Sequence, residues 1–439
     1  MFKVFLKTLG CPKNEVDSEY MSGLLKIEDK FKIVDKAKES DVIVVNTCGF
    51  INDAKEESIE TIFDALYYKK EGYCSAVVVT GCLTQRYFKE IKNEIPEIDA
   101  ILGTGNFDRL GEVINKVMNG KKTYKVTEDP SFNYKSTLPR NYSNNYSSYL
   151  KISEGCNNNC TYCTIPKIRG KLNSRNIEDV IKEAQNMIDN GIKEIIIVAQ
   201  DITQYGVDIY GESKLVNLLE KLTNLEGLKW IRLLYAYPER IDDELINLIK
   251  NEDKICNYLD IPIQHSAEEI RKKMGRKGNY KELIDLIEKI RNEIPDIVLR
   301  TSLIVGFPQE KEEDFNKLVD FVKKTKFSRL GVFKYSKEEG TPAYHMKGQV
   351  DEKTKEQRYN KIMQIQQKIS LENNKKLVGE ELEVLITDKK EDFYLARSQY
   401  DTPEIDNQIF LEGKSLSIGD FVKCRITEAK DYDLFAIEI

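Results

Sequence analysis

Histidine is scarce in this chain, and long apolar runs are missing. With only two histidines, His265 and His345, the sequence excludes a histidine-rich metal site. No apolar run approaches the roughly eighteen residues needed to cross a bilayer. The first residues lack the apolar core and cleavage site of a secretion signal. We therefore expect a cytoplasmic protein that does not bind a membrane.

An excess of positive charge is also missing. The 67 Lys and Arg residues are outnumbered by 73 Asp and Glu, so the formal net charge is −6. Such a charge argues against adhesion of nucleic acid to the whole surface. From residue 376 to the end, eight Lys and Arg stand against fifteen Asp and Glu, a net charge of −7. A module that tracks phosphates should be basic, whereas an acidic one suits a basic protein partner or is simply a solvated surface. Asp401, Glu404 and Asp406 are predicted to lie in an exposed loop there, where they would attract such a partner.

The pattern of apolar residues divides the 439-residue chain into several parts. Residues 1–120 alternate short apolar strands with amphipathic helices, which is typical of a parallel α/β sheet. Residues 121–148, rich in Ser, Asn and Tyr, are predicted to form a linker. Residues 149–351 contain six strand–helix units, which predict a partial β/α barrel. A connecting helix at 352–375 leads to short strands at 376–439, which predict a small all-β barrel of a kind that often binds a partner.

Three closely spaced cysteines follow the first predicted strand of the partial barrel. Cys156, Cys160 and Cys163 stand at spacings of four and three residues. Thiolates hold iron–sulfur clusters, and a four-iron cluster normally takes four of them, so three cysteines leave one iron open to another ligand. Structural zinc usually takes four ligands, often as two close cysteine pairs, and no second pair lies nearby. The spacing therefore favours an iron–sulfur cluster over zinc.

A second set of cysteines is dispersed through the first domain. Cys11, Cys48 and Cys82 each follow an apolar strand and each have a glycine neighbour. In a parallel sheet the loops after such strands share the carboxyl edge, and glycine lets the backbone approach a ligand closely. Two interpretations remain open, a second three-thiolate cluster or three buried structural cysteines. The remaining cysteines show no grouping and are expected to be packed in cores: Cys74, Cys256 and Cys424.

The barrel cysteines, with Tyr162 before the last of them, resemble the CxxxCxxC motif of the radical S-adenosylmethionine (SAM) superfamily. The order of three-cysteine domain, barrel and β module is similar to that of the methylthiotransferase family over nearly the whole chain, where the end module is a TRAM domain. The resemblance implies two [4Fe-4S] clusters on the two cysteine sets. It also implies SAM as both methyl donor and radical source, a low-potential electron donor and a sulfur donor.

The stretch Thr8-Leu9-Gly10-Cys11-Pro12-Lys13-Asn14 resembles one branch of this family, the RimO branch. That branch adds a methylthio group to the β-carbon of an aspartate in small-subunit ribosomal protein S-twelve, which is the expected partner. The tRNA adenosine branch, MiaB, tends to carry Gln-Met-Asn in place of Pro12-Lys13-Asn14, and it is the main alternative. A non-enzymatic iron–sulfur protein is a more distant one.

Further stretches that resemble the RimO branch follow predicted barrel strands, where barrel enzymes place their sites. They make Gln200, Gln264 and Gly306, beside Tyr162, the candidate SAM contacts. The alternative for Gly306 is that it only turns the chain, and the alternative for His265, next to Gln264, is a structural role. Gln309 is a departure, because the family usually has glycine at this position.

Overall fold

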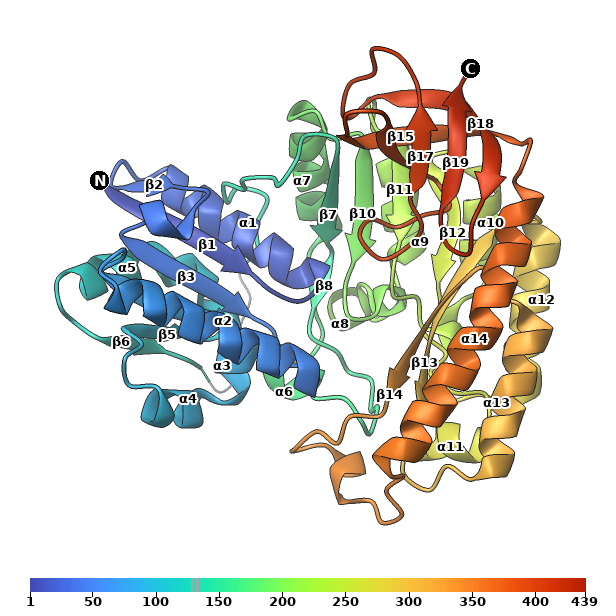
Figure 1. The fold of residues 1–439 in the computed structure, drawn as a ribbon, viewed down its shortest axis with the longest axis horizontal. Helices are drawn as coiled ribbons and strands as arrows, with labels where there is room; N and C mark the ends of the chain where they lie inside the picture. Colours follow the sequence, from blue (N-terminus) through green and yellow to red (C-terminus); the bar gives the residue numbers. More distant parts are fainter. Residues whose placement is uncertain (128–129, 131–133) are drawn as a thin grey trace.

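The structure is a computed structural model that describes residues 1–127, 130 and 134–439. Two α/β units lie side by side, and a small β-barrel lies against one end of the second (Figure 1). Five residues of the predicted linker, 128–129 and 131–133, lie outside the described residues. The three predicted units are confirmed: a parallel sheet, a partial barrel and a small all-β barrel.

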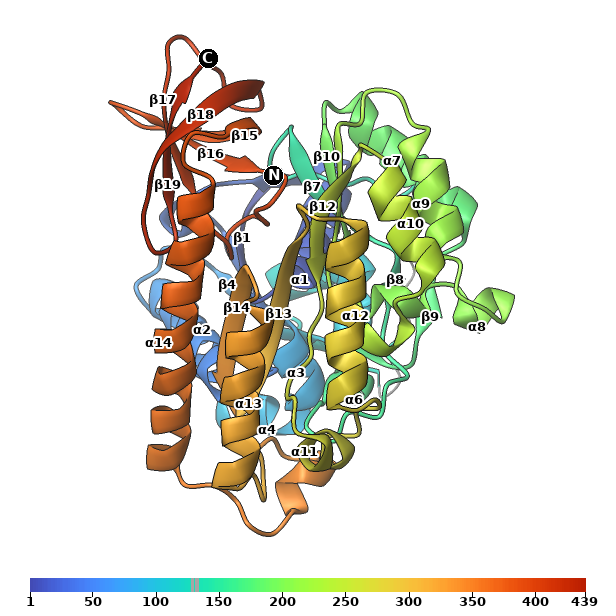
Figure 2. The same cartoon turned by 90° about the vertical axis from the view of Figure 1, so that its right-hand side faces the viewer.

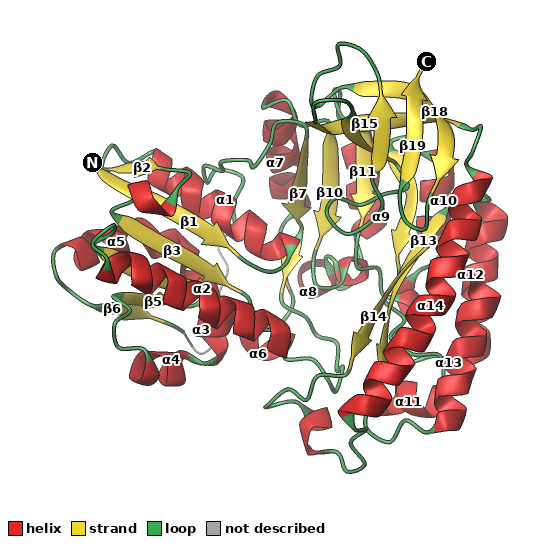
Figure 3. Cartoon of the chain, in the orientation of Figure 1, coloured by secondary structure: helices red, strands yellow, loops and turns green. Residues whose placement is uncertain are grey.

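The first unit is a six-stranded parallel sheet in the order β2-β1-β3-β4-β5-β6. Its central strands are continuous apolar runs because helices cover both faces, as Figure 3 shows. The strands are β1 (Phe2–Thr8), β2 (Phe31–Ile33), β3 (Val42–Thr47), β4 (Ala76–Gly81), β5 (Ala100–Leu102) and β6 (Thr123–Lys125). The helices are α1 (Pro12–Lys26), α2 (Asn52–Lys70), α3 (Cys82–Arg86), α4 (Phe88–Glu94) and α5 (Leu110–Met118). Strand β6 lies within the predicted linker, so the sheet continues beyond residue 120.

The second unit is an open, six-stranded parallel sheet in the order β14-β13-β12-β11-β10-β7. Its strands are β7 (Ser147–Lys151), β10 (Glu194–Val198), β11 (Trp230–Leu233), β12 (Ile255–Asp260), β13 (Val298–Val305) and β14 (Arg329–Lys334). A short ribbon of β8 (Ser153–Glu154) and β9 (Asn173–Ser174) follows β7. The helices are α6 (Ile165–Arg169), α7 (Ile177–Asp189), α8 (Val207–Tyr210), α9 (Leu215–Thr223), α10 (Asp243–Asn251), α11 (Glu268–Lys273), α12 (Tyr280–Glu293), α13 (Glu312–Thr325) and α14 (Glu352–Lys376). Figure 2 shows the longer ones standing side by side along the sheet.

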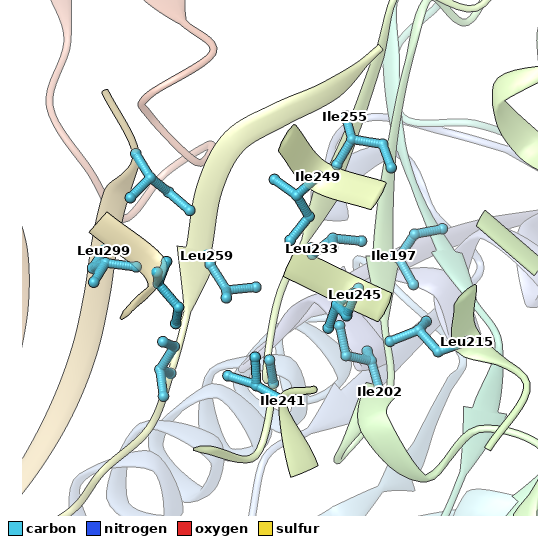
Figure 4. Close-up of a cluster of buried hydrophobic side chains, with 14 of the residues drawn as sticks. Ile197, Ile202, Leu215, Leu233, Ile241, Leu245, Ile249, Ile255, Leu259 and Leu299 are labelled. Atoms are coloured by element: carbon cyan, nitrogen blue, oxygen red, sulfur yellow. The ribbon is translucent and has the colours of Figure 1, made fainter. Parts of the chain in front are cut away.

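The core of the second unit lies between these strands and their helices. Leu233 and Leu259 point from neighbouring strands toward Leu245 and Ile249 of α10 (Figure 4). Each side chain of this kind stabilises the fold by about 1.5–3 kcal/mol when fully buried. The apolar residues recur at helical spacing on α10 and at strand spacing on the sheet, so both patterns face one core. This rigid layer fixes where the loops after the strands lie.

The C-terminal unit is a closed barrel with strand order β15-β16-β17-β19-β18. Its strands are β15 (Glu381–Lys389), β16 (Tyr394–Ser398), β17 (Ile409–Glu412), β18 (Phe421–Ala429) and β19 (Leu434–Glu438). Closure pairs β17 with β19 in parallel, whereas the other pairs are antiparallel. The barrel has its own apolar interior, which includes Cys424.

Buried charges join the C-terminal barrel to the second unit. Glu194 of β10 accepts hydrogen bonds from Arg232 (Nε, 3.0 Å) and from Arg397 of the C-terminal barrel (Nη1, 2.8 Å). All three side chains are almost fully buried. Because opposite charges are held at hydrogen-bond distance, the interface fixes the orientation of the two units.

The same interface corrects the expectation of an exposed acidic loop. Asp401 is buried and pairs with Arg329 (2.7 Å), and Asp406 accepts from the Tyr258 hydroxyl (2.7 Å). Only Glu404 is exposed. Two of the three carboxylates therefore face arginine and tyrosine side chains of the second unit, which the sequence alone could not reveal. Within the described residues, no helix is both long and apolar enough to span a membrane.

Candidate functional site

The structure brings the loops of the dispersed cysteines together. Cys11 caps the start of α1 after β1, Cys48 follows β3, and Cys82 is the first residue of α3 after β4. Strands β1, β3 and β4 are neighbours in the sheet and run parallel. Their carboxyl ends therefore meet at one edge, as the sequence predicted.

Glycines next to these cysteines let the three loops touch. A Cβ on Gly10 would lie 2.8 Å from Cβ of Cys48, and a Cβ on Gly49 would lie 2.7 Å from Cα of Leu83, the residue after Cys82. Real Cβ atoms do not approach other atoms this closely, so any larger residue would push the loops apart. The glycines are therefore required by the packing of one cysteine loop on the next.

Of the N-terminal thiols, Cys48 and Cys82 are buried and Cys11 is half-buried. Burial raises the pKa of the Cys82 thiol to about 12, while the nearby Arg169 guanidinium opposes this rise. Arg169 Nη2 lies 3.5 Å from Cys82 Sγ, and Asn14 holds the loops together by donating to the carbonyls of Leu9 (2.9 Å) and Thr47 (3.0 Å). A guanidinium beside the sulfur favours the thiolate that a metal would bind.

The three barrel cysteines lie in the loop between β8 and α6. Burial, together with the neighbouring thiols of the set, raises the pKa of Cys156 to about 11 and of Cys163 to about 12. Backbone N–H groups of Asn158 and Ile165 lie 3.4 Å from the sulfurs of Cys156 and Cys163. Hydrogen bonds to cluster sulfur atoms are one means by which proteins tune iron–sulfur sites.

Contacts with the end of α11 and with the segment after β10 hold this loop in place. Thr161 N–H donates to the Met274 carbonyl (3.0 Å), and Thr161 Oγ1 donates to the Lys273 carbonyl (2.7 Å). Asn158 Nδ2 donates to Asp201 (2.8 Å), which follows β10. The loop is thus anchored by segments far along the chain, as a site held in one geometry requires.

A network of buried charges forms the junction between α1 of the first unit and the segments that flank the barrel cysteines. Asp17 of α1 pairs with Lys151 (2.5 Å) and Arg169 (2.8 Å), and Glu154 pairs with the same two cations (2.9 and 2.8 Å). The Tyr134 hydroxyl also donates to Asp17 (2.5 Å). The pKa of Glu154 is about 2, because Arg169 and Lys151 outweigh the opposing effect of burial. Arg169 ends the helix that follows Cys163 and contacts Cys82, so it joins the segment after the barrel set to the N-terminal set.

Of the predicted SAM contacts, Gln200 lies at this junction and Tyr162 lies beside the barrel cysteines. Gln200 Nε2 donates to Glu154, whereas its Oε1 is buried without a partner among the described residues. Burial raises the pKa of Tyr162 well above its usual range, and the neighbouring Cys160 and Cys163 raise it further. Tyr162 also packs edge-on against Phe307. A buried amide oxygen without a partner is a group that a bound ligand could satisfy.

The other two candidates have backbone roles that need no ligand. Gln264 has a φ of +72° and forms an isolated bridge with Leu303 of β13. Gly306 has a φ of +73°, and a Cβ there would collide with the Lys355 side chain on α14. Packing thus gives one reason for this glycine, and its contact with SAM stays a prediction.

The neighbouring His265 has a structural environment. It is fully buried, and its Nδ1 accepts from the Ala267 N–H at 3.0 Å. Its Nε2 lies 3.7 Å from Oε1 of the buried Glu310. The ungrouped cysteines are also buried, as expected: Cys74, Cys256 and Cys424.

The donors at both cysteine sets fit iron–sulfur clusters. Each set offers three thiols, the ligand type that such clusters use. Across residues 1–127, 130 and 134–439, no three His, Cys, Asp or Glu side chains converge as a single metal ion requires. The thiols of each set are nevertheless close enough for their charges to influence one another's pKa.

Three cations beside the cysteine sets were not assigned by the sequence patterns. Lys13 and Arg169 lie near thiols of the N-terminal set, and Arg276 Nη1 lies 3.9 Å from Cys160 Sγ. Lys13 stood in the opening motif, but only as a marker of one branch. Arg169 and Arg276 had no local signal, because their place beside sulfur depends on the folding of distant segments.

Family comparisons match three parts of the chain. The Radical SAM superfamily matches residues 150–322, the Uncharacterized protein family UPF0004 matches residues 3–103, and the TRAM domain matches residues 378–439. These parts follow the order of the three structural units.

Curated relatives match nearly the whole chain. A protein of Desulforamulus reducens is 49% identical over 99% of both chains, and one of Lachnoclostridium phytofermentans is 50% identical over 98% of this chain and 99% of the relative. A protein of Clostridioides difficile is 48% identical over 99% of this chain and 98% of the relative. Each is named ribosomal protein uS12 methylthiotransferase RimO, which favours the ribosomal-protein branch over the tRNA branch.

Solved structures share the fold at low identity. The radical SAM methyltransferase TsrM of Kitasatospora setae, with cobalamin and a [4Fe-4S] cluster bound, has a TM-score of 0.57 and 14% identity. The match covers 78% of this chain and 73% of that protein. The cobalamin-dependent SAM radical enzyme OxsB has a TM-score of 0.51 and 12% identity, with 84% and 56% covered.

Proposed function

The chain belongs to the ribosomal protein uS12 methylthiotransferase family, and on this premise we propose how its residues divide the reaction. It is a radical SAM methylthiotransferase that modifies ribosomal protein uS12, with SAM and [4Fe-4S] clusters as cofactors. The proposed target is the β-carbon of an aspartate in uS12, where a methylthio group replaces one hydrogen.

We propose that Cys156, Cys160 and Cys163 hold one cluster in the barrel and leave one iron open to SAM. Bound there, the cluster and SAM supply one-electron chemistry that generates a hydrogen-abstracting radical. We propose that the N-terminal thiols hold a second cluster whose open iron takes a sulfur species: Cys11, Cys48 and Cys82. The observation that carries this assignment is the contact between Arg169, on the helix after Cys163, and Cys82 at 3.5 Å. This contact supports one shared reaction space between the two sets.

The protein's own side chains would orient SAM and exclude water. Gln200 is the best supported SAM contact, because its buried Oε1 lacks a partner among the described residues. Tyr162 would pack against the same ligand, and Gln264 and Gly306 would border it from the ends of neighbouring strands. The buried pairs around Glu154 would keep their charges neutralised while substrate is bound.

The reaction also needs partners that the chain does not supply. We propose a low-potential electron donor, a sulfur donor, and uS12, either free or in the small ribosomal subunit, as protein substrate. Because that substrate belongs to the ribosome, we also propose a cytoplasmic location.

Iron content and product analysis test the division of labour. Anaerobically reconstituted protein should bind about eight irons, as two four-iron clusters. Replacing the three barrel cysteines with alanine should leave about four irons and abolish reductive SAM cleavage. Replacing Cys11, Cys48 and Cys82 should also leave about four irons, but some SAM cleavage should survive while methylthio transfer stops.

A matched control uses three cysteines away from both sets. Alanine at Cys74, Cys256 and Cys424 should keep the full iron content, because these thiols are buried in separate cores. An unchanged iron content in either cluster variant would contradict the assignment of that set. Full methylthio transfer by the N-terminal variant would remove that set from the reaction.

A further inference from the structure

Lys13 is a buried cation without an ion pair. It is the second residue of α1 and only 9% exposed. Among the described residues, no carboxylate oxygen lies within 4.0 Å of its ammonium group, which instead lies 3.6 Å from the ring centroid of Tyr235. A positive charge at a helix N-terminus opposes the helix dipole, and burial without a counter-charge adds a further cost. Packing alone therefore does not account for a lysine at this position.

The other charges of the junction already balance. Asp17 and Glu154 carry two negative charges, and Lys151 and Arg169 carry two positive charges at 2.5–2.9 Å from them. Both oxygens of Glu154 are occupied, one by these cations and the other by Gln200. Lys13 is close enough to be influenced by Glu154 and Cys11, and no carboxylate of this balanced group pairs with it directly.

Lys13 lies where the two units meet. It follows Cys11 by two residues, and its partner ring belongs to Tyr235, just after β11 at the carboxyl end of the barrel sheet. Tyr235 has a φ of +64°, held by hydrogen bonds of its N–H to Asp260 and of its carbonyl to the Ile202 N–H (both 3.2 Å). Such a conformation is costly for a tyrosine and is found where the surroundings fix a side chain for function.

We propose that Lys13 binds the side-chain carboxylate of the target aspartate in uS12 and so selects an acidic residue at this site. The inference rests on the proposed function, and it adds the residue that recognises the substrate group. The β-carbon that receives sulfur is bonded directly to the carboxylate carbon. An ammonium group that holds the carboxylate beside Cys11 therefore fixes this carbon near the N-terminal cysteine set. Binding also supplies the directly paired carboxylate that Lys13 lacks among the described residues.

Substrate binding to the reconstituted enzyme, without reductant, tests the proposal separately from turnover. Mass spectrometry with the wild-type enzyme first identifies the target aspartate of uS12. The two probes are then purified, unmodified uS12 and the same protein with asparagine in place of that aspartate. Loss of a charge-assisted hydrogen bond weakens binding about ten- to one-hundredfold. Wild type should show this preference for the aspartate form, Lys13→Met should abolish it, and Lys13→Arg should retain most of it. Lys26→Met, at the exposed end of the same helix, is the matched control and should keep the preference.

The outcomes separate the inference from the proposed function. If wild type modifies no residue of uS12, the proposed function fails. If wild type modifies uS12 but Lys13→Met still prefers the aspartate form by the same factor, only the role of Lys13 is overturned. Loss of about four irons by Lys13→Met would assign the lysine to the N-terminal cluster and would likewise overturn its role in substrate recognition.

Discussion

Glu194→Gln removes one negative charge from the interface between the partial barrel and the C-terminal barrel. Glu194 accepts from Arg232 at 3.0 Å and from Arg397 at 2.8 Å, and Ser147 Oγ donates to it at 2.7 Å. The glutamine has almost the same shape but no charge, so two buried guanidinium groups would lose their counter-charge. The change leaves both cysteine sets untouched in sequence.

The size of the effect follows from the pKa of Glu194. The two arginines outweigh burial and lower this pKa from 4.5 to about 2. A shift of this size corresponds to about 3 kcal/mol of stability at neutral pH. Breaking one side of a buried ion pair typically costs about 3–5 kcal/mol, which agrees. Because the folded-state pKa lies below the unfolded value, this contribution is complete above pH 4.5 and is lost as the pH falls toward 2.

Urea unfolding of wild type and variant at neutral pH measures the difference. Glu194→Gln should lower the free energy of unfolding by about 3 kcal/mol, and the difference from wild type should shrink as the pH falls below 4.5. Glu383→Gln is a matched control at the same interface, because Glu383 pairs with Lys229 at 2.8 Å but both are exposed. It should cost less than about 1 kcal/mol. Equal effects of the two variants would refute the reasoning.

Two further predictions concern single positions. Gln309 has a φ of +66°, so Gln309→Gly relieves left-handed strain, although the flexibility of glycine in the unfolded chain offsets part of this gain. The free energy of unfolding should rise by about 0.5–1 kcal/mol, and a lower melting temperature would contradict this. Asp401→Asn should lower the free energy of unfolding, measured in urea, by about 3 kcal/mol, because it leaves the buried Arg329 without its carboxylate. Glu404→Gln on the same loop should change this free energy by less than about 0.5 kcal/mol, because Glu404 is exposed. A larger effect at Glu404 would show that the loop does not dock as described.

The sequence predicted the three structural units and both cysteine sets because residues close together in the chain indicate these features. An apolar run followed by glycine and cysteine predicts a buried strand and the residue at its end. Parallel pairing of β1, β3 and β4 then brings these ends to one edge of the sheet. The same signal failed for β2, β5 and β6. These strands have three residues each, too few for a periodic pattern, and β6 lies in a segment whose composition suggests a linker.

Features that depend on distant partners were not predictable in this way. Asp401 and Asp406 have the composition of an exposed loop, yet they are paired with Arg329 and Tyr258 of the partial barrel. Likewise, nothing near Arg169 in the sequence indicates its contact with Cys82. The net charge of −7 therefore overstates the negative surface that the C-terminal barrel offers to a partner.

Mass spectrometry of uS12 tests the central claim most directly. Purified uS12 would be incubated with the reconstituted enzyme, SAM, inorganic sulfide and a low-potential reductant, with tRNA present in the same reaction. We predict one methylthio group on an aspartate of uS12, and no modification with the alanine variant of Cys156, Cys160 and Cys163. A methylthio group on tRNA, with uS12 unmodified, would contradict the account.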